Sequence, residues 1–196
     1  MASAPYHQPG ANVVFWGLVA VSVLGEYVVR FRSRFNRSGT RSEHWSLPVV
    51  FVTITGGVAA GLVLAQRHVA PITTGRWPLF VVGLALMATG FLIRHWAILT
   101  LGPFFTVDVR VHPGQTVVES GPYRWVRHPS YTGMIVFLVG LGLAASDWAS
   151  LAVLALVPTV GLVVRIHLEE RALRDGLGDQ YGRFAATRRR LFPGVW

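Results

Sequence analysis

The sequence predicts an all-α polytopic membrane protein with about five transmembrane helices. Hydrophobic residues fill 52% of the 196 positions and charged residues only 14%, too few charges for a water-exposed surface of this size. The apolar residues gather into long runs, and three of the polar segments between them are rich in arginine. A chain of this length is expected to form a single membrane domain over residues 1–196.

Five apolar runs are expected to cross the bilayer, because each approaches the roughly 20 residues that a spanning helix needs. In chain order they cover about 13–29, 47–65, 77–101, 132–146 and 149–164. The first run contains Glu26 near its end, where the carboxylate is expected to reach the interface. The third contains Arg94 near its end, where an arginine either serves function or extends its charge to the interface. Both readings remain open for Arg94.

Arginine placement predicts the orientation. Fifteen of the 18 basic residues, all of them arginine, lie in 30–45, 102–131 and 165–196. The positive-inside rule therefore places these segments and the C-terminus in the cytoplasm and the N-terminus outside. The net charge of +9 lies beside apolar runs, which favours anionic lipid headgroups of the bilayer as partners and argues against nucleic acid.

Several kinds of site are excluded by composition or context. The chain has no cysteine, which rules out disulfides and thiolate sites, and its seven histidines show no ligand spacing, so no metal is expected. A glycine pattern at 140–145 matches the dinucleotide fingerprint. That pattern has meaning only after a strand, at the start of a helix, whereas this copy lies inside an apolar run. Its glycines are expected to serve close helix packing.

One polar stretch, 119–133, separates the third and fourth runs and contains two motifs. Gly121-Pro-Tyr123 and Arg127-His-Pro-Ser-Tyr131 combine turn signals with many hydrogen-bonding groups, and the next apolar run follows at once. By itself, such a stretch is also compatible with an ordinary cytoplasmic connection. After the last run come a Glu169-Glu170 pair, a Gly178-x-x-Tyr181 motif and the basic segment 188–190.

Together these motifs resemble the isoprenylcysteine carboxyl methyltransferase family of integral membrane enzymes, over about half of the chain from Arg94 onward. The resemblance implies a cytoplasmic pocket for S-adenosylmethionine, formed by the 102–131 loop and the tail 165–196. It also implies methyl transfer to a lipophilic acceptor, best represented by the carboxylate of an isoprenylcysteine. The family motifs are far less informative about the acceptor than about the family.

The resemblance also implies the roles of individual residues. The S-adenosylmethionine site is expected to comprise Gln115, Thr116, Val117, Val118, Tyr123, His128, Pro129, Ser130, Tyr131 and Glu169. The family usually has a histidine at the position of Gln115. Glu169 is expected to bind the ammonium of the methionine part, and Arg165 to hold an anionic acceptor. These two catalytic candidates are four residues apart on one helix face, so an interfacial salt bridge is the alternative.

Other parts of the tail are less defined by sequence. Glu170 points about 100° away from its neighbour Glu169, and its role stays open. The basic segment 188–190 is expected to contact lipid headgroups, and the resemblance implies that it folds back over the cofactor as a lid.

Two further functions remain as alternatives. A membrane sterol-reductase-like enzyme using NADPH has a similar loop and tail, but that family's tail is richer in aspartate and cysteine. A non-enzymatic membrane scaffold would explain the apolar runs, but not the pairing of the two motif sets. If the acceptor is prenyl-like, it should reach the site laterally from the bilayer. Small residues of the last two runs are expected either to leave room for its chain or to pack tightly: Gly133, Gly140, Gly142 and Gly161.

Overall fold

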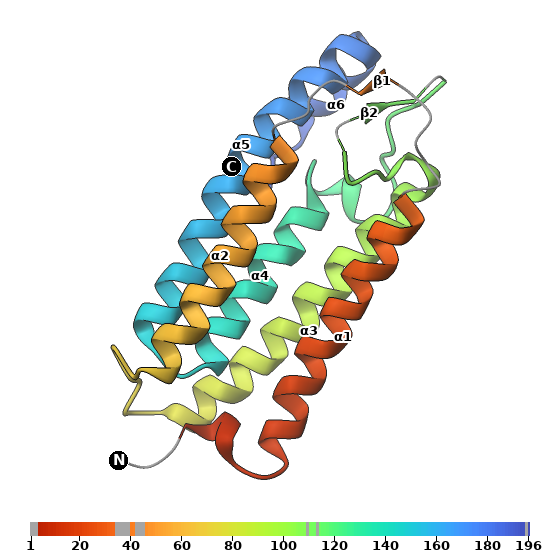
Figure 1. The fold of residues 1–196 in the computed structure, drawn as a ribbon. Helices are drawn as coiled ribbons and strands as arrows, with labels where there is room; N and C mark the ends of the chain where they lie inside the picture. Colours follow the sequence, from red (N-terminus) through yellow and green to blue (C-terminus); the bar gives the residue numbers. More distant parts are fainter. Residues whose placement is uncertain (1–3, 34–39, 42–45, 109, 113, 195) are drawn as a thin grey trace.

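The computed structural model describes residues 4–33, 40–41, 46–108, 110–112, 114–194 and 196. These residues form an elongated bundle of long helices that lie side by side and alternate in direction (Figure 1). The bundle helices are α1 (Ala11–Ser33), α2 (Ser46–Gln66), α3 (Arg76–Leu101), α4 (Pro129–Ala144) and α5 (Trp148–Leu177).

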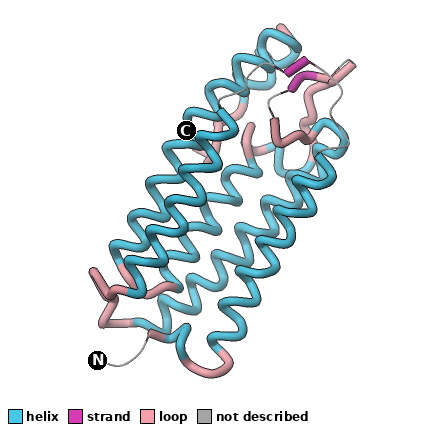
Figure 2. Tube along the Cα trace, viewed as in Figure 1, coloured by secondary structure: helices cyan, strands magenta, loops and turns pink. Residues whose placement is uncertain are grey.

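Short elements occupy the ends of the bundle, and helix dominates the described chain (Figure 2). Three are 3-10 helices: η1 (Pro5–His7), η2 (Gly102–Phe104) and η3 (Gly121–Arg124). The last helix is α6 (Asp179–Thr187). β1 (Thr40–Arg41) and β2 (Arg110–Val111) pair antiparallel, with Thr40 opposite Val111.

The predicted all-α membrane architecture is confirmed. Within the described residues, α1, α2, α3 and α5 are long and apolar enough to cross a membrane. The fourth predicted run corresponds to α4, which has 16 residues and is therefore about 24 Å long. α5 has 30 residues, or about 45 Å, and so exceeds the roughly 30 Å hydrocarbon core. Part of α5 therefore lies beyond the core, and its last turns carry Glu169 and Glu170.

Glycines bring α3 and α4 into close contact. A Cβ on Gly90 would lie 2.4 Å from the backbone nitrogen of Phe137, and one on Gly133 would lie 2.6 Å from that of Arg94. Seven residues along each helix, Gly83 and Gly140 interlock in the same way. Small residues let helix backbones approach closely in membranes, so these positions fix the α3–α4 spacing.

A buried carboxylate stabilises the end of the bundle where the described N-terminal residues lie. Asp147 accepts hydrogen bonds from the backbone nitrogens of Ala70 (2.8 Å) and Ser150 (2.9 Å), which caps α5 and ties it to the α2–α3 connection. α1 packs at this end, where Phe15 stacks on Tyr6 and lies 6.4 Å from Phe80 between ring centroids. This aromatic cluster holds the base of α1.

The other end collects the polar segments. The 102–128 connection, the β1–β2 pair and α6 lie together at the end away from the N-terminus (Figure 1). The described parts of the three arginine-rich segments therefore share one end, as the predicted topology requires. The assignment of that end to the cytoplasm stays a prediction.

Candidate active site

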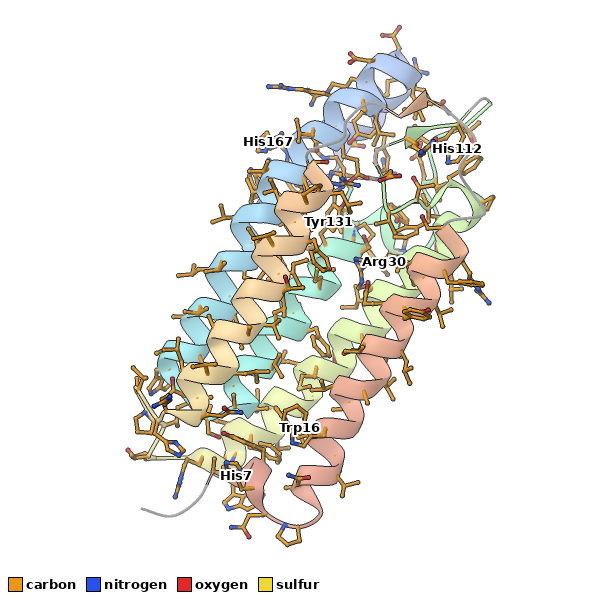
Figure 3. The ribbon with its side chains drawn as sticks, viewed as in Figure 1. His7, Trp16, Arg30, His112, Tyr131 and His167 are labelled. Carbon is orange, nitrogen blue, oxygen red and sulfur yellow. The ribbon has the colours of Figure 1, made fainter. Side chains whose placement is uncertain are left out.

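A cavity of about 700 Å³ runs from this polar end down between the helices. Its upper part is lined by the 104–118 connection, the first turn of α4 and the last turns of α5. Its lower part is apolar, with walls from α1 and α2 and a floor from α3 and α4. Figure 3 shows Arg30 of α1 and Tyr131 of α4, two of its lining residues, in the region between the α1 and α2 ribbons. One continuous space thus joins a polar and an apolar compartment.

Most residues predicted to bind the cofactor line this cavity. They are Gln115, Thr116, Val117, Val118, Tyr123, His128, Ser130, Tyr131 and Glu169, and Arg165 joins them. Pro129 is buried at the first position of α4, where its fixed backbone angle starts the helix. Gln115 accepts a hydrogen bond from the His112 backbone nitrogen (2.9 Å), so its side-chain oxygen closes a local turn.

The start of α4 aims its polar side chains at α5. The Tyr131 hydroxyl donates to Glu169 Oε2 at 2.7 Å, and the His128 ring stacks on the Tyr131 ring with centroids 5.7 Å apart. The motif residues and the glutamate pair, about 40 residues apart in sequence, therefore meet through direct contacts. The grouping of these residues agrees with their predicted roles, which remain predictions.

Arg165 and Glu169 do not bind each other directly, although the Tyr131 side chain interacts with both. Arg165 donates through Nη1 to Ser46 Oγ (2.7 Å) and through Nη2 to the Val107 carbonyl, while Glu169 accepts from Tyr131. In the described part of the chain, the two side chains form no ion pair with each other. The alternative of a simple i,i+4 salt bridge is therefore not what the geometry shows. Arg165 instead joins α2, the 102–128 connection and α5.

Glu170, whose role the sequence left open, is the centre of an ionic cluster. Its carboxylate is only 2% exposed and accepts from Arg127 (2.5 Å) and Arg190 (3.1 Å). His128 Nε2 lies 3.4 Å away, and Arg174 approaches to 3.6 Å. The cluster thus ties α5 to the motif loop and to the tail.

The tail folds back along the motif loop. The backbone nitrogens of Arg127 and His128 donate to the carbonyls of Arg189 and Arg190, each at 2.9 Å. Thr132 Oγ1 donates to the Leu191 carbonyl at 2.6 Å. The interpretation of 188–190 as a lipid-headgroup contact is wrong for Arg190, whose guanidinium binds Glu170. A sequence signal for the Arg190–Glu170 contact does exist: the tail has many arginines and one adjacent pair of glutamates, Glu169 and Glu170.

The sequence left two readings open for Arg94: a functional residue, or an arginine that extends its charge to the interface. Its Nε and Nη2 both donate to Glu26 of α1, the second at 2.7 Å, and its Nη1 lies 3.4 Å from the Ser130 carbonyl. Glu26 therefore does not simply reach the interface, since it pairs with an arginine inside the bundle. Both side chains line the cavity.

Burial and nearby carboxylates raise the pKa of two tyrosines of the polar end further above neutral pH. The pKa of Tyr123 is raised by burial and by the nearby Glu169 carboxylate. Burial and the Glu170 and Glu169 carboxylates likewise raise the pKa of Tyr181, which belongs to the Gly-x-x-Tyr motif and also lines the cavity. Both phenols therefore remain hydrogen-bond donors at neutral pH.

The glycines expected to leave room for an alkyl chain do not do so. A Cβ on Gly142 would lie 2.6 Å from Leu151 Cα, and one on Gly161 would lie 2.1 Å from Thr53 Oγ1. Gly133 and Gly140 are occupied in the same way by α3. The packing alternative is therefore the correct one, and the apolar part of the cavity is lined instead by side chains of α1 and α2, among others.

Comparisons with known proteins agree with the motifs. The model of the isoprenylcysteine carboxyl methyltransferase (ICMT) family matches residues 81–175. A probable protein-S-isoprenylcysteine O-methyltransferase of Oryza sativa subsp. indica is 32% identical over 124 residues, covering 62% of this chain and 65% of the relative. A methanethiol S-methyltransferase of Mycobacterium tuberculosis is 29% identical over 198 residues, covering 93% and 77%.

A solved structure extends the similarity to the fold. The eukaryotic intramembrane Ras methyltransferase ICMT superposes with a TM-score of 0.68 at 22% identity, covering 94% of this chain and 68% of that one. The first curated relatives are longer than the shared region, since this chain covers 50% of an uncharacterized Bacillus subtilis protein, YpbQ, and 65% of the rice protein. The resemblance predicted from the motifs is confirmed: residues 81–175 of this membrane protein match the model of the isoprenylcysteine carboxyl methyltransferase family, and the chain shares the fold of the solved ICMT.

Proposed function

We propose that this protein transfers a methyl group from S-adenosylmethionine to a lipophilic acceptor, with the carboxylate of an isoprenylcysteine as the best candidate. The observation that carries the proposal is the single cavity that joins the polar motif residues to an apolar groove. A polar methyl donor and a lipid-like acceptor each find a matching compartment there. The ICMT family, whose methyl donor is S-adenosylmethionine, supports the same assignment.

The residues of the polar end fit such a donor. S-adenosylmethionine supplies an electrophilic methyl group on a sulfonium. Glu169, oriented by the Tyr131 hydroxyl, offers a carboxylate for the ammonium of its methionine part. Tyr123 and His128 present ring faces and polar atoms on the cavity wall. The tail is docked beside this end of the site, where Arg190 binds Glu170.

The reaction with a carboxylate acceptor requires alignment more than proton transfer. A carboxyl group with an ordinary pKa near 4 is already ionised at neutral pH, so no general base is needed. Arg165 is fixed by its bonds to Ser46 Oγ and to the Val107 carbonyl, and it would orient the anion through its planar guanidinium. Holding the reacting atoms in line and excluding water then lowers the barrier.

The two substrates should use separate openings. The donor is polar and reaches the site from the aqueous side, next to the tail. A prenyl chain gains about 0.8 kcal/mol per buried methylene in the bilayer and would lose that energy by leaving it. The groove between α1 and α2 offers a lateral path lined by Val19, Val23, Val50, Ile54 and Val58.

A thiol is the second candidate acceptor, and it rests on the methanethiol S-methyltransferase, whose alignment covers 93% of this chain. A cysteine-type thiol has an ordinary pKa near 8.5 and a simple alkanethiol a higher one, so a thiol acceptor must lose its proton before it attacks. Turnover with a thiol should therefore rise with pH up to about 8.5, whereas turnover with a carboxylate should be flat above about pH 6. Assays of both acceptors across this range separate the two reactions.

The donor is tested by parallel calorimetry with S-adenosylhomocysteine and NADPH on detergent-solubilised protein. S-adenosylhomocysteine should bind and raise the thermal midpoint, because a ligand that binds the folded state stabilises it. Stabilisation by NADPH alone would instead support the sterol-reductase-like alternative. If neither ligand binds, the scaffold alternative gains support.

The division of roles between Arg165 and Glu169 is tested by two variants. Arg165→Ala should abolish turnover and largely spare S-adenosylhomocysteine affinity, whereas Glu169→Ala should weaken that affinity directly. Equal losses of affinity would show that both residues act only through the structure of the site. Thermal unfolding of each variant monitors the fold, because Arg165 also bonds to Ser46.

A further inference from the structure

The Glu26–Arg94 pair occupies the cavity at the boundary between its apolar and polar compartments. Glu26 lies seven residues before the end of α1, and Arg94 lies seven before the end of α3. Seven residues of helix correspond to about 10 Å, so the pair is about two turns deep. Arg165, by contrast, bonds to the first residue of α2 and to the 102–128 connection. An acceptor moving up the groove therefore meets Arg94 before Arg165.

Arg94 presents an anion site that is already shaped. Its Nε and Nη2 grip the two carboxylate oxygens of Glu26, the side-by-side geometry by which arginine binds carboxylates. Its remaining nitrogen Nη1 faces the carbonyl of Ser130, next to Tyr131. An anion on the same edge of Arg94 would thus lie beside the residue that binds Glu169.

The two partners of the pair differ in freedom. The Arg94 side chain is 11% exposed and lies on α3, which is locked to α4 by interlocking glycines. The Glu26 side chain is 44% exposed and lies on α1, whose aromatic anchor is at the opposite end of the bundle. Glu26 can therefore leave by rotating its own side chain, while Arg94 stays in place.

We propose that Glu26 is a specificity-determining residue that holds the place of the acceptor's anion on Arg94. A buried guanidinium without an anion is strongly destabilised, so an arginine that receives a lipid carboxylate needs a substitute whenever the groove is empty. The arriving carboxylate replaces Glu26 on the same two nitrogens, and the charge of Arg94 remains balanced throughout. An uncharged headgroup cannot make this exchange, so the groove selects lipids with an anionic end. This inference rests on the proposed function for the lipophilic acceptor.

The test measures binding, not methyl transfer. The probes are a (prenylthio)acetate, prenyl–S–CH2–COO⁻, which carries a terminal carboxylate on an apolar chain, and the matching carboxamide, which is uncharged and nearly isosteric. Calorimetry of the full chain in detergent gives the ratio of the two affinities for the parent and for Glu26→Gln. Removing the competing carboxylate should tighten binding of the carboxylate probe about tenfold and leave the carboxamide unchanged.

Two further variants keep the outcome interpretable. The double variant Glu26→Gln with Arg94→Met removes both charges of the pair together and should weaken the preference for the carboxylate, leaving only the part that Arg165 supplies. Glu119→Gln is the matched control, since Glu119 pairs with Arg188 at 2.7 Å outside the cavity lining. It should change neither affinity. If Glu26→Gln unfolds, the double variant alone still tests whether the pair creates the preference.

The results separate this inference from the proposed function. An unchanged affinity ratio in Glu26→Gln, an undiminished preference in the double variant, or no binding of the carboxylate probe overturns the role of Glu26. If the protein methylates an isoprenylcysteine but the affinity ratio in Glu26→Gln is unchanged, the proposed function stands and the role of Glu26 does not. If the affinity ratio rises in Glu26→Gln but the protein methylates no acceptor, the anion site is supported and the proposed reaction is contradicted.

Discussion

The two sides of the cavity are built differently. On one side, α3 and α4 interlock through two glycine pairs, and nine of the sixteen residues of α4 are buried. On the other side, α1 has two buried residues among twenty-three, Phe15 and Val29. The family match, residues 81–175, covers α4, most of α3 and nearly all of α5 but neither α1 nor α2.

This difference indicates a division of labour. Methyl transfer requires fixed positions for its reacting groups, which a closely packed scaffold supplies. Under the proposed function, a lipid acceptor would need a wall with few packing constraints, and α1 has few buried residues. The predictions below test this division, from the largest expected effect to the smallest.

Glu170→Gln should have the largest effect, because it leaves Arg127 and Arg190 in a cluster without their carboxylate. Breaking a buried ionic cluster on one side costs about 3–5 kcal/mol. The tail should detach, and S-adenosylhomocysteine affinity should fall with it. Thermal unfolding, calorimetry and limited proteolysis of the tail measure the three changes. The exposed pair is the control: Glu119→Gln should cost about 0–1 kcal/mol, and equal effects of the two variants would contradict the model.

Gly90→Ala on α3 and Gly17→Ala on α1 compare the closely packed α3–α4 side of the cavity with the loosely packed α1 side. The new Cβ of Gly90→Ala would lie 2.4 Å from the Phe137 backbone nitrogen, so α3 and α4 must separate, at a cost of about 1–3 kcal/mol. Gly17→Ala on α1 places its Cβ in open space and should be neutral or stabilising by up to about 1 kcal/mol. Thermal midpoints of the two variants decide. A similar loss in both would mean that α1 is packed as tightly as α4.

Tyr131→Phe should affect ligand binding more than stability. It removes the 2.7 Å hydrogen bond that orients Glu169, and a bond to a charged group contributes about 1.5 kcal/mol or more. S-adenosylhomocysteine affinity should therefore fall about tenfold, as measured by calorimetry. Unchanged affinity would show that Glu169 is oriented without the tyrosine.

Arg30→Gln should have the smallest effect on stability. The Arg30 guanidinium lies over the Phe51 ring at 5.3 Å, a contact between α1 and α2 at an exposed position. Such contacts contribute about 0.5–1 kcal/mol. The thermal midpoint should therefore barely move. A loss as large as that of Gly90→Ala would show that this contact, and not the base of the helix, holds α1 in place.

The sequence by itself predicted the membrane helices and the candidate site residues, most of which line one cavity. Apolar runs predict spans because the bilayer leaves no other way to satisfy the backbone, and that requirement is local to each segment. The family motifs are also contiguous stretches, so Tyr123, His128, Tyr131 and Glu169 were identifiable before any fold was known. The exact end of α5 could not be identified from the sequence, because helical periodicity continues past the hydrocarbon core.

Only the tertiary structure decided which side chains pair and where the bundle is open. Glu26 meets Arg94 across 68 residues, and Ser46 meets Arg165 across 119. From the sequence, the glycines of α4 and α5 were compatible either with a gap or with close helix packing, because a missing Cβ permits both. The structure shows close packing against the neighbouring helices. Helix packing, not local sequence, sets these distances, and a burial pattern alone does not specify which apolar faces meet.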